Sequence, residues 1–406
     1  MSVSSATRRG DGHTAAAAVL FLCLFAGQAG AIALAPVLAE VARDLEVSTA
    51  EVGQLRTVAS LAAAVTALVL GRLAAGVALG RQLLGGALML AIGALASAAA
   101  PGIALLAVAQ VPVGSGIAVL TTAGTLAAAE WVPAERRAAT LSWALIGQPA
   151  AWIVGMPLLG FVGERSWRYA WLVLPLTAAL LAGAALVGRG RTPRASTTPP
   201  RMGAALAVPG IRRWLAAELL ANTAWAGTLV YAGALFVESY EASPALAGGV
   251  LAGGAVAYVT GNLAFRPFAE HEPRRLLSGL SIGLAVATAL FGIVRPSLGA
   301  SAALFSFAAF CAGGRTLLAS AYGLSAPQEV RAAAVALRAA AMQFSYFTGS
   351  FTAGAALAVG GYGAFGATIG ALFLAAALVL GRAATGDERS RTAPARLRLA
   401  HISIWR

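Results

Sequence analysis

Glu218 is the residue in this sequence most suited to exchange a proton. It is the only acidic residue well inside an apolar run. Burial away from water favours the neutral form of a carboxyl group, so a buried glutamate can bind and release a proton near neutral pH. Glu218 also lies only about 6 Å from the start of its expected helix, where it could pair with an arginine such as Arg338. A proton site and a structural ion pair both fit this position.

Amide and aromatic side chains form a second candidate site. Gln148 and Trp152 are four residues apart and Gln343 and Tyr346 are three apart, so each pair would share a helix face. Other such residues inside apolar runs are Gln28, Asn222 and Trp225. Polar groups at mid-membrane usually face a cavity, and amides with aromatics would suit an amphipathic organic molecule. Hydrogen bonding between helices is the alternative for each residue.

Other chemistry is sparse. Cys23 and Cys311 both fall in apolar runs, and the three histidines are too scattered for a zinc site. Arg315, about 27 Å from the external end of its expected helix, could attract an anionic substrate or extend to the cytoplasmic surface. Without a nucleophile–base pair, a metal cluster or a phosphate loop, the sequence predicts no enzyme, no cofactor and no metal site.

Membrane-spanning helices must position these residues. The 406-residue chain is 59% hydrophobic and only 11% charged, whereas soluble domains contain about 25% charged residues. A bilayer core about 30 Å thick requires about 20 apolar residues in a helix. Twelve runs meet this requirement, at approximately 14–38, 51–71, 82–100, 103–129, 139–162, 167–188, 214–236, 245–265, 275–294, 297–322, 332–359 and 362–381.

The arginines predict the orientation of these helices. All 29 basic residues are arginine, and 23 fall on one side if both termini are cytoplasmic, as the positive-inside rule expects. Arg56 is among the few assigned to the external face. Topology therefore accounts for the net charge of +13, and no soluble basic domain is present to bind nucleic acid.

Composition divides the chain into five segments. They are a cytoplasmic tail at 1–13, a six-helix bundle at 14–188, a basic linker at 189–213, a second six-helix bundle at 214–381 and a cytoplasmic tail at 382–406. The linker holds six arginines and no acid, and its Pro, Ser and Thr residues keep it from folding alone. We expect it to fix topology and tether the bundles, with binding to anionic lipid as the alternative.

The two halves repeat at an offset of 194 residues. The pattern P-x-E-x-R begins at Pro133 and again at Pro327. Other residues related by this offset include Arg72 and Arg266, Arg81 and Arg275, Gly155 and Gly349, Gly160 and Gly354, and Gln28 and Asn222. Repeated six-helix halves are typical of secondary transporters, whose substrate site lies between the halves near mid-membrane.

Four stretches resemble the major facilitator superfamily, most closely its twelve-helix bacterial drug:proton antiporter branch. They are 34–55 (LAPVLAEVARDLEVSTAEVGQL), 131–137 (WVPAERR), 155–160 (GMPLLG) and 167–171 (WRYAW). The resemblance covers roughly residues 14–381 and implies two bundles that give access to a central site from each side in turn. It also implies a role in conformational change for the loop residues Arg72 and Arg81, and for Gly155, Pro157 and Gly160 in the fifth helix. A simple packing groove between helices is the alternative for the fifth-helix residues. Trp167 and Trp171 are expected at the external interface, as aromatic anchors.

Two departures from the family pattern concern latching and proton transfer. Ala75 occupies the place of an aspartate that helps latch the outward-open form in the family, so a weaker latch is expected. Gln110 replaces an arginine of the fourth helix that is implicated in proton transfer in antiporters. Proton coupling therefore does not follow from the resemblance.

The expected protein is an all-α membrane protein with twelve transmembrane helices in two pseudo-symmetric six-helix bundles. We expect a monomer in the inner (plasma) membrane that exports a small organic compound, with protons as a candidate coupling ion. Uptake of a nutrient by the same fold and a non-transporting scaffold or sensor are the alternatives.

Overall fold

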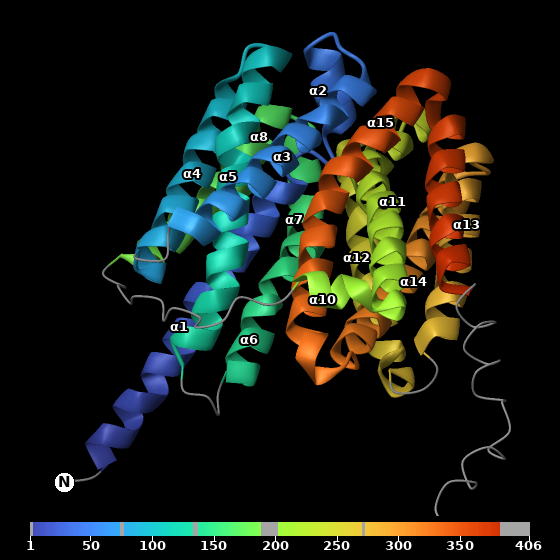
Figure 1. Cartoon of the computed structure of the whole chain (residues 1–406). Coiled ribbons are helices and arrows are strands. Elements are labelled where there is room, and N and C mark those ends of the chain that lie inside the picture. Colours follow the sequence, from blue (N-terminus) through green and yellow to red (C-terminus); the bar gives the residue numbers. More distant parts are fainter. Residues whose placement is uncertain (1–2, 74–76, 133–136, 188–201, 270–272, 382–406) are drawn as a thin grey trace, which may run out of the picture.

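The computed structural model describes residues 3–73, 77–132, 137–187, 202–269 and 273–381, and these residues form helices and no strands. Their helices fall into two groups that stand side by side (Figure 1). The first group contains α1 (Val3–Ile32), α2 (Leu38–Asp44), α3 (Thr49–Leu73), α4 (Leu79–Ala99), α5 (Ile103–Glu130), α6 (Arg137–Leu145), α7 (Gly147–Gly163), α8 (Trp167–Trp171), a π-helix (Leu172–Leu176) and α9 (Thr177–Leu186). The second contains α10 (Met202–Ala207), α11 (Pro209–Tyr240), α12 (Pro244–Ala264), a 3-10 turn (Arg266–Phe268), α13 (Pro273–Ile293), α14 (Leu298–Leu324) and α15 (Gln328–Gly381).

Twelve membrane-length segments result from these helices. Eleven helices within the described ranges are long and apolar enough to cross a membrane, and α15, at 54 residues, is twice the usual length. Its backbone leaves the helical region at Gly360 and Gly361. The break separates residues 328–359 from residues 362–381, at the boundary expected from the sequence. The all-α fold of two six-helix bundles is confirmed.

Prolines explain three differences from the expected spans. The first helix ends at Ile32 rather than near residue 38, because the residue before Pro36 is disfavoured in a helix. The fifth span is divided between α6 and α7, since Pro149 has no N–H to donate to the carbonyl of Leu145. In the sixth span, Pro175 lies inside the π-helix that joins α8 to α9.

The helices also extend into segments that were expected to be irregular. α1 begins at Val3, within the expected N-terminal tail. α10 and the start of α11 occupy the second half of the expected linker, where Ala205 packs with Trp214 and Ala326 in a small apolar cluster. Several expected features lie outside the described residues: Ala75, the loop 133–136, the linker residues 189–201 together with residue 188, and the tail 382–406.

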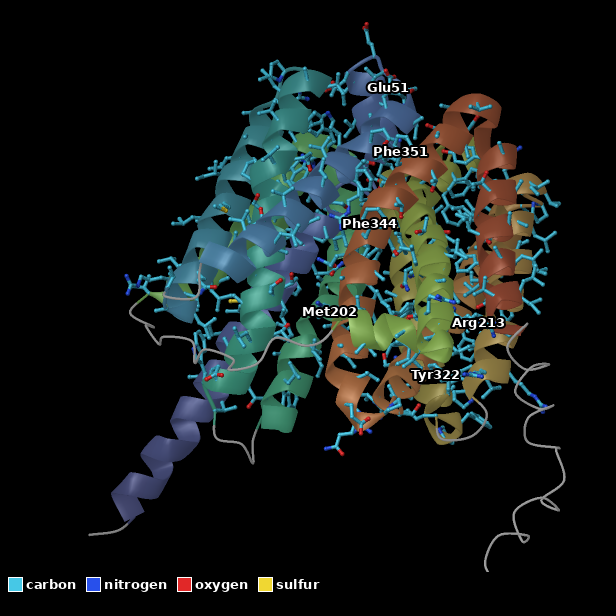
Figure 2. All side chains as sticks on the ribbon, viewed as in Figure 1. Glu51, Met202, Arg213, Tyr322, Phe344 and Phe351 are labelled. Atoms are coloured by element: carbon cyan, nitrogen blue, oxygen red, sulfur yellow. The ribbon has the colours of Figure 1, made fainter. Side chains whose placement is uncertain are left out.

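The outer surface is apolar. Large aliphatic side chains such as Leu68 and Val108 are 68% and 65% exposed, and Phe344 and Phe351 are exposed along α15 (Figure 2). Exposed apolar patches of this extent are rare on soluble monomers. Hydrocarbon is the solvent that matches this surface.

Two seams join the bundles, and the repeat relates one to the other. α3 packs against the first part of α15, and α7 packs against α12. A shift of 194 residues places residues 49–70 of α3 on 243–264, which is α12, and places α7 on residues 341–357 of α15. The pseudo-symmetry predicted from the sequence is thus present in the seams themselves.

Close backbone contacts and hydrogen bonds between the bundles gather at the end that carries α2, which we call the α2 end. Tyr231 in α11 donates from its hydroxyl to the carbonyl of Ala50 in α3 at 3.3 Å, and Thr49 donates to Glu238. At the opposite end, which we call the α10 end, no hydrogen bond or ion pair links the bundles between described residues. The bundles are therefore joined more tightly at the α2 end.

Candidate functional site

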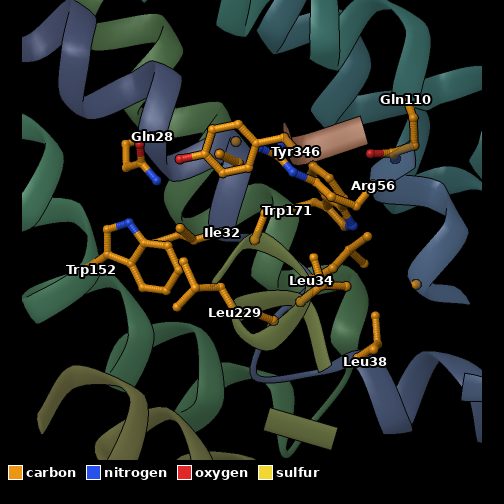
Figure 3. Close-up of a pocket in the computed structure, with 16 residues that line it drawn as sticks. Gln28, Ile32, Leu34, Leu38, Arg56, Gln110, Trp152, Trp171, Leu229 and Tyr346 are labelled. Atoms are coloured by element: carbon orange, nitrogen blue, oxygen red, sulfur yellow. The ribbon is translucent and has the colours of Figure 1, made fainter. Parts of the chain in front are cut away.

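A small cavity of about 40 Å³ lies between the bundles. Figure 3 shows its principal side chains. Its lining residues are Gln28, Gly30, Ala31, Ile32, Leu34, Ala35, Leu38, Gly53, Arg56, Gln110, Trp152, Trp171, Ala226, Leu229, Val230 and Tyr346. A water molecule requires only about 10–15 Å³, whereas pockets for drug-sized ligands measure about 300 Å³ or more. The site has room for a few waters in this arrangement, and a larger solute requires the bundles to separate.

The cavity lies across the pseudo-symmetry of the two halves. Trp152 in α7 and Tyr346 in α15 both line it and are 194 residues apart. The same offset relates the lining residues Ile32 and Ala226. Equivalent positions in the two repeats therefore meet at one site, as expected for a substrate site between repeats.

Arg56 is the charged residue of this lining, and its place there differs from the sequence prediction. Counting arginines predicts an external position for Arg56, but the structure places it in the cavity, with its guanidinium carbon 5.3 Å from the centre of the Tyr346 ring. Thr49, Gly53 and Arg56 share one face of α3 by their spacing, and this face contacts the second bundle. The i, i+4, i+7 pattern was the signal available in the sequence.

Two amides complete the polar part of the lining. Gln28 is half-buried beside Tyr346 (Figure 3). Gln110 is buried and donates to Ser97 Oγ at 3.1 Å and to the carbonyl of Leu106 at 3.3 Å. The residue that replaces the family's arginine is thus held in place by α4 and by its own helix.

Four other candidates lie outside this lining. Asn222 donates to the carbonyl of Glu218 at 2.7 Å, one turn earlier in α11. Trp225 stacks between Tyr258 and Phe305, with ring centres 6.5 and 6.3 Å away. Gln148 is half-buried in α7 and Gln343 is exposed on α15. The structure therefore brings together Gln28, Trp152 and Tyr346, but not these four.

Glu218 lies in a separate ionic cluster inside the second bundle. Its side chain is fully buried, and Arg338 donates from Nε to its Oε2 at 2.7 Å. Arg315 lies 2.6 Å from Oε1 and donates to Ser281 Oγ and to the carbonyl of Ala217. The pairing with Arg338 is one of the two alternatives raised from the sequence. Arg315 neither faces the cavity nor extends to the surface, because Glu218 holds it in the interior.

The predicted gating residues of α7 lie at or beside the α7–α12 seam. A Cβ at Gly160 would clash with the carbonyl of Pro244, and Pro157 lies beside Gly248 of α12. Gly155 instead faces its own bundle, where a Cβ would come within 2.6 Å of Leu174. Arg81 is exposed on α4, and the side chain of Arg72 is outside the described residues.

Trp167 and Trp171 do not act as aromatic anchors in lipid, and that expectation was wrong. Both are buried, and Trp171 lines the cavity. Trp167 donates from its indole nitrogen to Asp44 Oδ2 at 2.9 Å, and Arg168 donates to the same oxygen at 2.5 Å. These hydrogen bonds, the one from Arg168 above all, lower the pKa of the Asp44 carboxyl below its ordinary value. The polar contacts fasten α8 to α2.

The family model of the Major Facilitator Superfamily matches residues 20–240, more than half of the chain. The chain therefore belongs to the major facilitator superfamily. Members of this family are membrane transporters and not enzymes, they bind small molecules, and they commonly function as monomers. The protein is thus a secondary membrane transporter.

Solved structures with the same fold agree with this assignment. A bacterial homolog of the human lysosomal transporter Spinster, in an inward-facing and unoccupied conformation, aligns with a TM-score of 0.69 at 14% identity, over 92% of this chain and 95% of that chain. Its inward-facing and occupied form gives the same TM-score and identity, over 93% and 96%. At this identity the likeness concerns the fold. No curated protein sequence matches the chain.

Proposed function

We propose that the protein exports a small organic compound by alternating access, with the cavity around Trp152 and Tyr346 as its binding site. The observation that carries the proposal is the uneven contact between the bundles. They touch closely at the α2 end, and both of them line the cavity. Repeated bundles that share a central site and pack more tightly at one end fit the transport mechanism of repeated-half carriers.

We propose that the α10 end faces the cytoplasm and that both termini lie there, in the plasma membrane. The concentration of arginine in the expected cytoplasmic segments supports this orientation. The arrangement described here is then sealed toward the outside. The bundles at 14–188 and 214–381 are proposed to move as units, with glycine contacts such as Gly160 with Pro244 permitting the motion.

Glu218 is proposed to act as a structural ion and not as the proton carrier. Both of its oxygens contact a guanidinium group, so proton binding would have to displace an arginine. The described lining of the cavity contains no carboxylate. Coupling to protons is therefore tested directly, by measuring flux in proteoliposomes with and without a pH gradient.

Direction is tested in cells that lack efflux pumps. The strain expresses the wild type or one of two variants. Gly248→Val places a side chain against the carbonyl of Met156 across the α7–α12 seam, whereas the side chain of the control Gly249→Val meets no neighbouring atom. Export predicts lower accumulation of substrate with the wild type and Gly249→Val but not with Gly248→Val. Higher accumulation would indicate uptake. Equal accumulation in all strains, at equal surface expression, would favour a scaffold or sensor.

A further inference from the structure

Charged residues deep in the described membrane segments are few and mostly positive. Only Arg56, Glu218, Arg315 and Arg338 lie seven or more residues from the ends of these segments. Three are guanidinium groups and one is a carboxylate. A charge at this depth is costly and usually has a partner or faces a pathway. Arg315 and Arg338 share the carboxylate of Glu218. Of these four residues, Arg56 is therefore the one that has no ion-pair partner among the described residues.

Arg56 has the aromatic ring of Tyr346 as its neighbour, but no acidic group. No ion pair or hydrogen bond joins Arg56 to a carboxylate among the described residues, and the lining contains neither Asp nor Glu. The face of the Tyr346 ring attracts a cation only modestly. The guanidinium is therefore oriented toward the cavity and retains its capacity to bind an anion.

Arg56 also lies deeper along α3 than the hydrogen bonds that join the bundles at the α2 end. It lies about 10 Å along α3 from Thr49 by the helical rise. Between them, Gly53 packs against the phenol of Tyr231, and Tyr231 bonds to the carbonyls of Ala50 and Ser350. These contacts between the bundles lie between Arg56 and the α2 end of α3, so a ligand approaching from the α10 end would meet the guanidinium before it reached them.

We propose that the cavity binds an amphipathic organic monoanion, whose acidic group pairs with Arg56 and whose apolar body lies against Trp152 and Tyr346. This inference rests on the proposed transport function and names its substrate class. The planar fork of arginine binds a carboxylate through two parallel hydrogen bonds. A single guanidinium matches a single negative charge, and Gln28 supplies an amide for a further polar group. An organic cation would meet repulsion at this site.

The test compares ligands of equal shape and different charge. Binding of 2-naphthoate and 2-naphthamide, and of octanoate and octanamide, is measured by isothermal titration calorimetry on the full chain in nanodiscs. Proteins studied are the wild type, Arg56→Gln, Arg56→Lys and, as control, Arg213→Gln, which alters an exposed arginine on α11. Hydrogen bonds to a charged group predict that the wild type prefers the carboxylate by about 10- to 100-fold.

The preference should vanish in Arg56→Gln, persist partly in Arg56→Lys and remain unchanged in Arg213→Gln. Affinity for the amides should change little in Arg56→Gln, and this unchanged affinity would show that the variant is folded. Equal binding of acid and amide by the wild type, no binding of either acid, or a preference that survives in Arg56→Gln would overturn the proposal. Flux of the same ligands in proteoliposomes separates the two proposals. Binding of anions without flux contradicts only transport, and flux of neutral compounds that is independent of Arg56 contradicts only the anion site.

Discussion

Arg338 donates from Nε to Oε2 of Glu218 at 2.7 Å, while Arg315 occupies the other side of the same carboxylate at 2.6 Å. One acid thereby joins three helices, α11, α14 and α15, within the second bundle. Removing one member of a buried ionic cluster usually leaves an uncompensated charge in a medium that solvates it poorly. The cluster therefore contributes to the integrity of the bundle.

Glu218→Gln should destabilise the protein by about 3–5 kcal/mol, because both arginines lose their counter-charge. Thermal unfolding in detergent measures the effect, with Glu164→Gln, on the surface at the end of α7, as the control expected to match the wild type. A Glu218→Gln protein that unfolds like the wild type but has lost the pH dependence of its flux would instead identify a proton carrier.

Gly248→Val should hold the α2 end apart. The new side chain would overlap the carbonyl of Met156, and overpacking of this kind costs about 1–3 kcal/mol. Spin labels at Glu164 and Leu246, both exposed at the α2 end of the α7–α12 seam, should show a longer distance by double electron–electron resonance. Gly249→Val, one residue away in open space, should leave the distance unchanged, and a similar lengthening there would refute the explanation.

Gly361→Ala should destabilise the second half of α15. Gly361 has φ +60° and ψ −160°, a region open almost only to glycine, and a side chain there costs about 1–3 kcal/mol. Gly363→Ala is the matched control, since it has no neighbour within 4 Å and no positive φ, and alanine favours helix. Melting temperatures that fall equally in both variants would argue against strain at Gly361.

Asp44→Asn should lower stability by less than about 1 kcal/mol at pH 7, because the Asp44 side chain is 47% exposed and water screens its pairing with Arg168. The pKa of Asp44 is lowered in the folded protein. Its contribution is therefore complete above the ordinary value of about 3.9 and disappears as the pH falls through the lower folded value.

The difference in melting temperature between the wild type and Asp44→Asn should accordingly stay constant from pH 7 to about pH 5 and shrink in stronger acid. A difference that grows on acidification would show that another group sets the pH dependence.

Much of the fold could be predicted because the rules that govern it are local. Runs of apolar residues gave the spans, and two adjacent glycines at 360 and 361 marked the break within α15. The P-x-E-x-R repeat predicted which helices correspond. Proline-induced breaks within spans, as at Pro149, were harder to predict, since a proline within a transmembrane helix need not end it.

The site was less predictable, because its residues are fixed by rotation of helices against each other. The depth of a residue along its helix follows from its number, but the direction in which its side chain points depends on how the helix packs. Gln28 and Asn222 are equivalent by the repeat, yet Gln28 lines the cavity while Asn222 bonds to its own helix. Counting charges assigns Arg56 to the external face, whereas the structure shows that Gly53, on the same helix face, contacts Tyr231 of the other bundle.

The two seams, α3 with α15 and α7 with α12, have a mechanical consequence. If the two bundles move as rigid bodies, the two seams define a line between them. Rotation about that line is the movement that keeps both seams in contact. In the proposed exchange of access, the seams would serve as the axis of rotation, and a solute in the proposed site between Trp152 and Tyr346 would lie beside that axis. Exchange of access would then move the bound solute very little, because it lies near the rotation axis. The ends of the helices lie far from the axis and would move the most.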